Sequence, residues 1–157
     1  MVDELETLAK TSFCGSLSRQ TIEFLRERSE IVTRGRKATF FAEGESGDAV
    51  YVLLEGSVAV VKCCGGREVT IAQLAAGDMF GEMALVAIRK RNATVRAETD
   101  CTALKLRHQG ILDLYHHDPE QFTLLQMNLS REMARRLATA NEQLFDARCQ
   151  GYLSANP

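Results

Sequence analysis

One short stretch of the chain places a glycine, a carboxylate and a guanidinium close together. Glu82 follows Gly81 directly, and Arg91 begins a second β-type segment a few residues later. A glycine lets an anion approach the backbone, and unpaired N–H groups at the start of a helical turn favour negative charge. A carboxylate accepts hydrogen bonds from sugar hydroxyls, and the arginine fork matches the two free oxygens of a phosphodiester. This combination suits a ligand with both a phosphate and a vicinal hydroxyl, and it predicts a cyclic mononucleotide site.

Each of these residues also has a plain structural explanation when it is taken alone. Gly81 suits a turn, Glu82 suits the first turn of a helix, and the basic run 89–91 suits a solvated loop. Arg91, however, enters a segment in which alternate side chains face inward, and an inward arginine in a small apolar barrel needs an anion. The small side chain of Ala93 leaves room for that anion beside the strand.

The middle of the chain is rich in turns and reads as a series of short strands. Eight of the eleven glycines fall between Gly35 and Gly81, and both prolines lie outside that segment. About eight short, evenly spaced strands predict a mainly β fold with flanking helices, namely an eight-stranded jelly roll or double-stranded β-helix. After a first run from Ile31, the β-type runs are 40–41, 50–54, 57–63, 69–71, 93–98 and 102–106.

Helical patterns flank the strands on both sides. Ser18 can cap a helix that runs to about Ser29. Asp118-Pro119 is a strong helix start, because it offers an acceptor at the N-cap and proline at the first helical position. The apolar residues that follow recur every three or four positions and predict one face of a long helix. They are Phe122, Leu125, Leu129, Met133 and Leu137, with Leu144 further on.

The length of 157 residues, with 45% hydrophobic and 25% charged residues, predicts a single globular domain over 1–157. We expect an N-terminal helical portion over 1–30, the β-roll over 31–107 and two C-terminal helices over 108–148. Nothing after Leu137 has the pattern of a DNA-reading helix.

Composition also sets expectations about partners and location. The net charge of −2 gives no broad positive field, so no nucleic-acid partner is expected. No run approaches the roughly 20 apolar residues of a membrane span, and the N-terminus does not read as a secretory signal, so we expect a cytoplasmic protein without a membrane partner. The five cysteines form no CxxC pair and are expected to be reduced thiols. Since the three histidines lie in a helical segment away from the cysteines, no metal site is predicted. No cofactor and no catalytic residue is predicted either.

The segment Phe80-Gly81-Glu82-Met83-Ala84-Leu85, with Arg91-x-Ala93-Thr94-Val95, closely resembles the phosphate-binding cassette of cyclic nucleotide-binding domains. That family includes protein kinase A regulatory subunits, cyclic nucleotide-gated channels and the bacterial catabolite activator protein. The resemblance extends to Glu43-Gly44-Glu45-x-Gly47-Asp48, to Tyr51 and to Glu55-Gly56-Ser57-Val58. It implies an eight-stranded jelly roll with an N-terminal helical portion and two C-terminal helices.

The resemblance also implies roles for the site residues. Glu82 would hold the ribose 2′-hydroxyl, and Arg91 would pair with the cyclic phosphate, assisted by backbone N–H groups around Ala84 and Ala93. Gly81 and Met83 would lie against the ligand, and Asn92 could donate to a phosphate oxygen or to the base. The predicted ligand-binding residues are Gly81, Glu82, Met83, Ala84, Arg91, Asn92 and Ala93.

The long helix from Pro119 would act as a mobile lid over the base, with Met133, Arg136 and Leu137 as candidates that the sequence does not rank. Two features depart from the family pattern. Residues 87–90 replace the glycine and proline that often precede the arginine, so the loop can differ in shape. Asn92 stands where cGMP-selective members often have threonine, which favours cAMP.

We therefore predict a regulatory, non-enzymatic module that binds cAMP, with cGMP as the other candidate ligand, and that moves its C-terminal helix on binding. The main alternative is a jelly-roll interaction or dimerisation module that has lost nucleotide binding. A metal-dependent jelly-roll enzyme and a truncated transcription factor are weaker alternatives. A homodimer through the C-terminal helix and an unidentified effector protein are open as partners.

Overall fold

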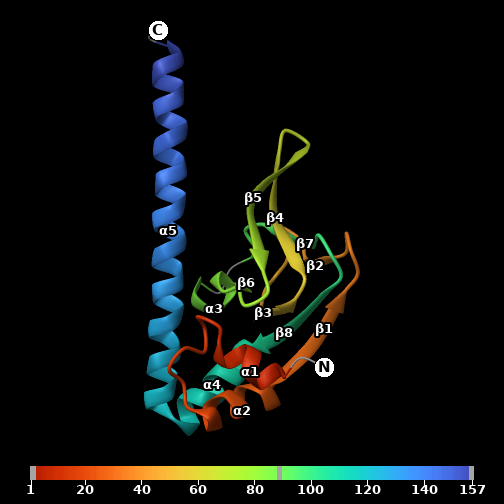
Figure 1. Ribbon diagram of the computed structural model, residues 1–157, viewed down its shortest axis with the longest axis vertical. Helices are drawn as coiled ribbons and strands as arrows, with labels where there is room; N and C mark the ends of the chain where they lie inside the picture. The colour runs from red at the N-terminus through yellow and green to blue at the C-terminus, as the bar shows by residue number, and fades with distance from the viewer. Residues whose placement is uncertain (1–2, 88–89, 156–157) are drawn as a thin grey trace.

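The structure, a computed structural model, describes residues 3–87 and 90–155 (Figure 1). Within these residues, eight strands form two antiparallel sheets with the orders β1-β8-β3-β6 and β2-β7-β4-β5. The first strand pairs with the last, the second with the seventh, and so on inward to the β4–β5 hairpin, so the chain folds as a jelly roll. The predicted fold class is therefore confirmed. The strands are β1 Ser29–Arg34, β2 Thr39–Phe41, β3 Ala49–Glu55, β4 Ser57–Cys64, β5 Arg67–Ala75, β6 Met79–Phe80, β7 Thr94–Ala97 and β8 Cys101–Arg107.

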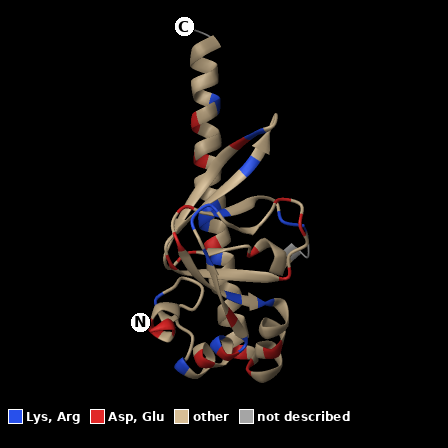
Figure 2. Ribbon diagram, turned by 90° about the vertical axis from the view of Figure 1, so that its right-hand side faces the viewer, with Lys and Arg blue, Asp and Glu red and all other residues tan. Residues whose placement is uncertain are grey.

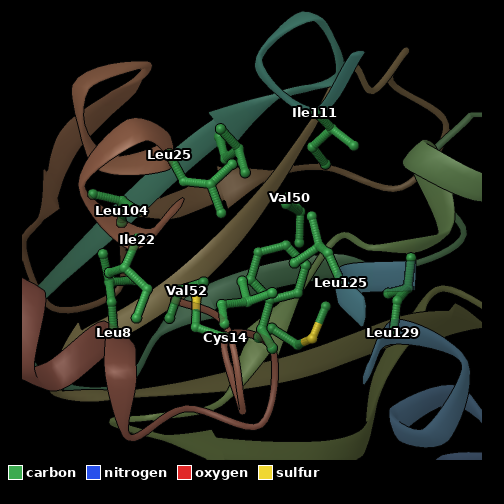
Figure 3. Close-up of a cluster of buried hydrophobic side chains, with 14 of the residues drawn as sticks. Leu8, Cys14, Ile22, Leu25, Val50, Val52, Leu104, Ile111, Leu125 and Leu129 are labelled. Atoms are coloured by element: carbon green, nitrogen blue, oxygen red, sulfur yellow. The ribbon is translucent and has the colours of Figure 1, made fainter. Parts of the chain in front are cut away.

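Strand β3 shows why the sequence forms two apolar layers. Its residues are almost all buried, and alternate side chains point to opposite faces of the sheet. Val50 and Val52 pack toward the helices, in the cluster shown in Figure 3. Tyr51 and Leu53 point into the roll, where they pack with aromatic rings including Phe80. A one-residue slip of this strand would exchange the two layers, so its register is strongly specified.

Five helices occur in the described residues. They are α1 Glu4–Ala9, α2 Arg19–Glu27, α3 Met83–Ala87, α4 His108–His117 and α5 Pro119–Ala155. The predicted caps are present, since Ser18 accepts the N–H of Thr21 at 3.1 Å and Asp118 accepts the N–H of Gln121 at 3.1 Å. Helices α1, α2, α4 and the first part of α5 cover one end of the roll, and α5 then continues alongside the roll and past it (Figure 1).

Several element bounds differ from the sequence expectations. Helix α1 lies within the expected N-terminal helical portion, although no separate helix was predicted at these residues, and the strands begin at Ser29 rather than at Ile31. The last helix continues to Ala155, past the expected limit of 148, because no proline or helix-ending glycine turn interrupts it. No helix of the described residues is long and apolar enough to cross a membrane.

Candidate functional site

Arg91 lies in the loop that leads into β7, and its side chain is turned into the roll. It is only 7% exposed. Its two terminal nitrogens each donate to a backbone carbonyl at 2.9 Å, one to Gly81 and the other to Ala49. The guanidinium carbon also lies 4.0 Å from the centre of the Phe41 ring, in cation–π geometry. The side chain is therefore held in one position from three sides.

Two glycines make room for this guanidinium. A Cβ at Gly47 would lie 2.5 Å from the Arg91 Cζ, and one at Gly81 would lie 2.6 Å from its Nη1. Gly81 also has φ +77°, a left-handed conformation that glycine adopts at little cost. Any side chain at either position would therefore displace the guanidinium.

The charge of Arg91 is poorly compensated by the protein. Within residues 3–87 and 90–155 it forms no ion pair with a carboxylate, and its buried Nε has no hydrogen-bond partner. Burial lowers the pKa of Arg91 below its ordinary value, and the same environment raises the pKa of the Tyr51 phenol. A buried cation with an unsatisfied donor is costly unless an anion joins it, so this arrangement favours the binding of an anion.

Glu82, at the start of α3, is 8% exposed and is paired with a cation from the last helix. Nη1 of Arg136 on α5 lies 3.1 Å from its carboxylate. Arg136 also donates to the carbonyl of Met79 and, at 2.9 Å, to Glu132 one turn earlier on α5. This contact joins α5 to the floor of the site.

A pocket of about 560 Å³ lies between the roll and α5, and both Glu82 and Arg91 line it. Its roll side includes apolar residues of β4 and β5, and its other wall is a stretch of α5 from Glu132 to Gln143. Figure 2 shows that Lys and Arg are interspersed with Asp and Glu over the described chain. All seven predicted residues line this pocket: Gly81, Glu82, Met83, Ala84, Arg91, Asn92 and Ala93.

Four of these residues make contacts with one another that the sequence did not indicate. The Nδ2 of Asn92 lies 3.1 Å from the sulfur of Met83, a weak acceptor. The N–H of Ala84 donates to the carbonyl of Gly81 at 3.3 Å, within the turn that opens α3. Although the set is brought together, its action on a ligand stays a prediction.

The structure separates the three candidates that were proposed on the long helix. Arg136 lines the pocket, whereas Met133 packs against the helical core and Leu137 is 62% exposed. Sequence reasoning missed Gly47, although it lies in a quoted motif, because its contact with Arg91 is tertiary. It also missed the α5 residues beyond Arg136, and their spacing from it at three, four and seven positions is the signal that could have found them.

Comparison with known proteins gives consistent results. The cyclic nucleotide-binding domain family matches residues 32–118. The chain is 32% identical over 126 residues to the cAMP-activated global transcriptional regulator CRP of Salmonella typhimurium. The aligned residues make up 79% of this chain and 58% of that protein.

Two solved structures are similar over most of the chain. One is the N-terminal domain of a transcriptional regulator from Streptomyces coelicolor, with 30% identity, a TM-score of 0.71, and 88% of this chain and 94% of that chain covered. The other is the catabolite activator protein of Thermus thermophilus, with 27% identity, a TM-score of 0.76, and 88% and 63% covered. The names of these relatives describe regulators rather than enzymes. With the jelly roll and a family match over more than half of its length, the chain belongs to the cyclic nucleotide-binding domain family.

Proposed function

We propose that this chain binds cAMP in the pocket between the roll and α5, and that Arg91 pairs with the cyclic phosphate. The observation that carries the proposal is the buried guanidinium of Arg91, which has an unpartnered Nε and no ion pair within the described residues. A cyclic phosphodiester supplies one negative charge and two free oxygens, which suits a guanidinium already fixed by two carbonyls.

In this proposal Glu82 accepts the ribose 2′-hydroxyl. Since the same carboxylate accepts from Arg136, the sugar must either share it with α5 or displace the helix contact. Ligand binding then changes the contacts of α5, and a ligand that prefers one arrangement of α5 shifts the population toward it. This is the regulatory step that we propose, with α5 as the moving element.

The choice of cAMP over cGMP rests on two supports. Asn92 stands where cGMP-selective members often have threonine, and the Salmonella relative is described as cAMP-activated. We propose DNA binding only for a longer protein that contains this chain. The curated relative is a transcriptional regulator, and this chain spans only 58% of its length. Our expectation that nucleic acid is not a partner concerns the charge of these 157 residues alone.

We also propose that α5 pairs with a second copy of the chain. From Leu137 onward the large apolar residues of α5 are more than half exposed, including Leu137, Leu144 and Phe145. A helix that exposes such residues at heptad-like spacing is typical of a coiled-coil interface. Light scattering should give the mass of a dimer, and a monomer at all accessible concentrations would contradict this part.

Calorimetric titration tests the site. Wild-type protein should bind cAMP, and Arg91→Ala should bind it at least about tenfold more weakly, since a charge-assisted pair is lost. Arg96→Ala is the matched control, because Arg96 lies on the adjoining strand and pairs with Glu68 outside the pocket. Equal affinity of Arg91→Ala and wild type would reject the site. No binding of either cAMP or cGMP to wild type would favour a dimerisation module that has lost the ligand.

A further inference from the structure

Strand β2 carries two adjacent phenylalanines that are both buried inside the roll. Phe40 and Phe41 are each 7% exposed and belong to the same apolar layer. Successive side chains of a regular strand point to opposite faces, so one of the two would ordinarily face outward. The register of β2 against β7 shifts between Thr39 and Phe41, where β2 has one residue more than β7. Such a bulge re-aims a side chain, and here it brings both rings to the inner face.

The two rings have different neighbours inside the roll. The Phe40 ring lies 5.0 Å from the Phe80 ring in edge-to-face geometry, and Phe40 is not among the described residues that line the pocket. Phe41 does line the pocket, and the centre of its ring lies 4.0 Å from the guanidinium carbon of Arg91. The Tyr51 ring is further from that carbon, at 5.9 Å. The bulge therefore places Phe41 directly against the buried cation.

The contact with Phe41 restrains Arg91 in a direction that its hydrogen bonds do not. The terminal nitrogens of Arg91 donate to the carbonyls of Gly81 and Ala49, and the N–H donors of a guanidinium lie in its plane. These bonds leave the group able to tilt out of that plane. A ring packed on the guanidinium face limits the tilt and excludes water from that side. The donors that the two carbonyls leave free then keep one orientation.

We propose that Phe41 is a positioning residue, whose ring holds the Arg91 guanidinium in the orientation that receives the anionic group of the ligand. This inference rests on the proposed function. The face of an aromatic ring attracts a cation, and the attraction is stronger when the pair is desolvated, as it is for these two buried residues. Loss of the ring lets Arg91 take other orientations, and the affinity falls with the fraction of molecules in which Arg91 is competent.

The test compares Phe41→Leu with Phe40→Leu by calorimetric titration with cAMP. The two phenylalanines are equally buried on one strand, so both substitutions should lower the unfolding temperature by a similar amount. Phe41→Leu should bind cAMP about five- to twentyfold more weakly than wild type, whereas Phe40→Leu should stay within about twofold. Phe41→Tyr keeps the ring face and should restore the affinity to within about threefold of wild type.

A second variant reduces the attraction to the cation while the ring keeps its shape. Replacement of Phe41 by a phenylalanine with three ring fluorines leaves the ring nearly the same size, but the fluorines withdraw electron density from its face. This variant should bind cAMP about two- to fivefold more weakly than wild type. It tests the proposal even where Phe41→Leu does not fold.

A double substitution shows whether Phe41 acts through Arg91. In an Arg91→Ala background there is no guanidinium to hold, so Phe41→Leu should cause less than about a twofold further loss of affinity for cAMP. A further loss as large as in the wild-type background would overturn the positioning role.

The remaining outcomes separate this proposal from the proposed function. If wild type binds cAMP and the fluorinated variant binds it equally well, the positioning role is overturned and the proposed function stands. Equal weakening by Phe40→Leu and Phe41→Leu also overturns the positioning role, because it marks a general effect of packing in the roll. If wild type binds neither cAMP nor cGMP, both proposals are overturned.

Discussion

Nη1 of Arg136 lies 3.1 Å from the carboxylate of Glu82, so an exposed helix and the buried floor of the pocket share one ion pair. The two residues are far apart in the sequence and come from different layers of the fold. Glu82 is nearly buried, whereas Arg136 keeps about a third of its side chain in solvent. This asymmetry leads to the first prediction.

Arg136→Ala should lower the free energy of unfolding by roughly 1–2 kcal/mol, because it leaves the buried Glu82 carboxylate without its cation. Chemical denaturation measures the change. Arg135→Ala is the matched control, since the Arg135 side chain is 64% exposed and pairs only with Glu132 among the described residues. It should change stability by less than about 0.5 kcal/mol. Equal effects of the two substitutions would contradict a special role for the Glu82 contact.

Gly47→Ala should weaken cAMP binding by about tenfold or more, or about 1.4 kcal/mol. The new Cβ would lie 2.5 Å from the Arg91 Cζ, so the guanidinium must move out of its position. Gly35→Ala is the control, because its Cβ would come no closer than 3.8 Å to Asp100. Titration of both variants tests this, and unchanged affinity in Gly47→Ala would show that the position of Arg91 is not critical.

Asn128→Ala should destabilise the protein by roughly 1–3 kcal/mol, since it removes a buried donor from two carbonyls. The amide nitrogen of Asn128 on α5 donates to the carbonyls of Phe13 at 3.1 Å and Gly15 at 2.7 Å. It thereby ties the long helix to the loop after α1. Asn141→Ala on the exposed part of α5 should have little effect in the same thermal and chemical denaturation experiments. A similar loss for both would indicate a general effect of substitution in α5.

Stability should fall as the pH rises from about 9 to about 11. Burial raises the pKa of the Cys14 thiol from 9.0 to about 11, so the folded chain keeps a proton that the unfolded chain releases in this range. The contribution is fully present below pH 9. Tyr51 acts in the same direction, because burial raises its pKa as well.

Denaturation at several pH values should give a shallower decline for Cys14→Ala than for wild type. Thiol labelling offers a second check, since Cys63 and Cys64 are exposed whereas Cys14 and Cys101 are buried. At pH 8 the first two should react quickly and the last two only after unfolding. Parallel pH slopes for wild type and Cys14→Ala would contradict the assignment.

The jelly roll and the main pocket residues were predictable because their signals are local. The glycine turns define short strands, and Gly81, Glu82 and Arg91 lie within one strand–helix–strand segment whose own geometry brings them together. The alternation in β3 likewise determines both apolar layers. In such cases a short stretch of sequence contains the whole physical argument.

Other features depended on tertiary packing and could not be predicted. Helix α1 has six residues, too few to be stable alone, and it is held largely by burial of Leu8. The contact of Gly47 with Arg91 joins two loops that are far apart in the sequence. The choice among Met133, Arg136 and Leu137 depends on the rotation of α5 about its axis, which the packing of Leu125 and Leu129 sets.

Helix α5 runs without a break for 37 residues, with Arg136 near its midpoint. At a rise of 1.5 Å per residue, the part from Arg136 to Ala155 is a stiff rod of about 28 Å, and a tilt of about 5° at the pocket would carry its tip through roughly 2.5 Å. A sub-ångström rearrangement beside the Glu82 carboxylate can therefore be amplified by leverage along α5. The resulting displacement of the helix tip is large enough to make or break a van der Waals contact there.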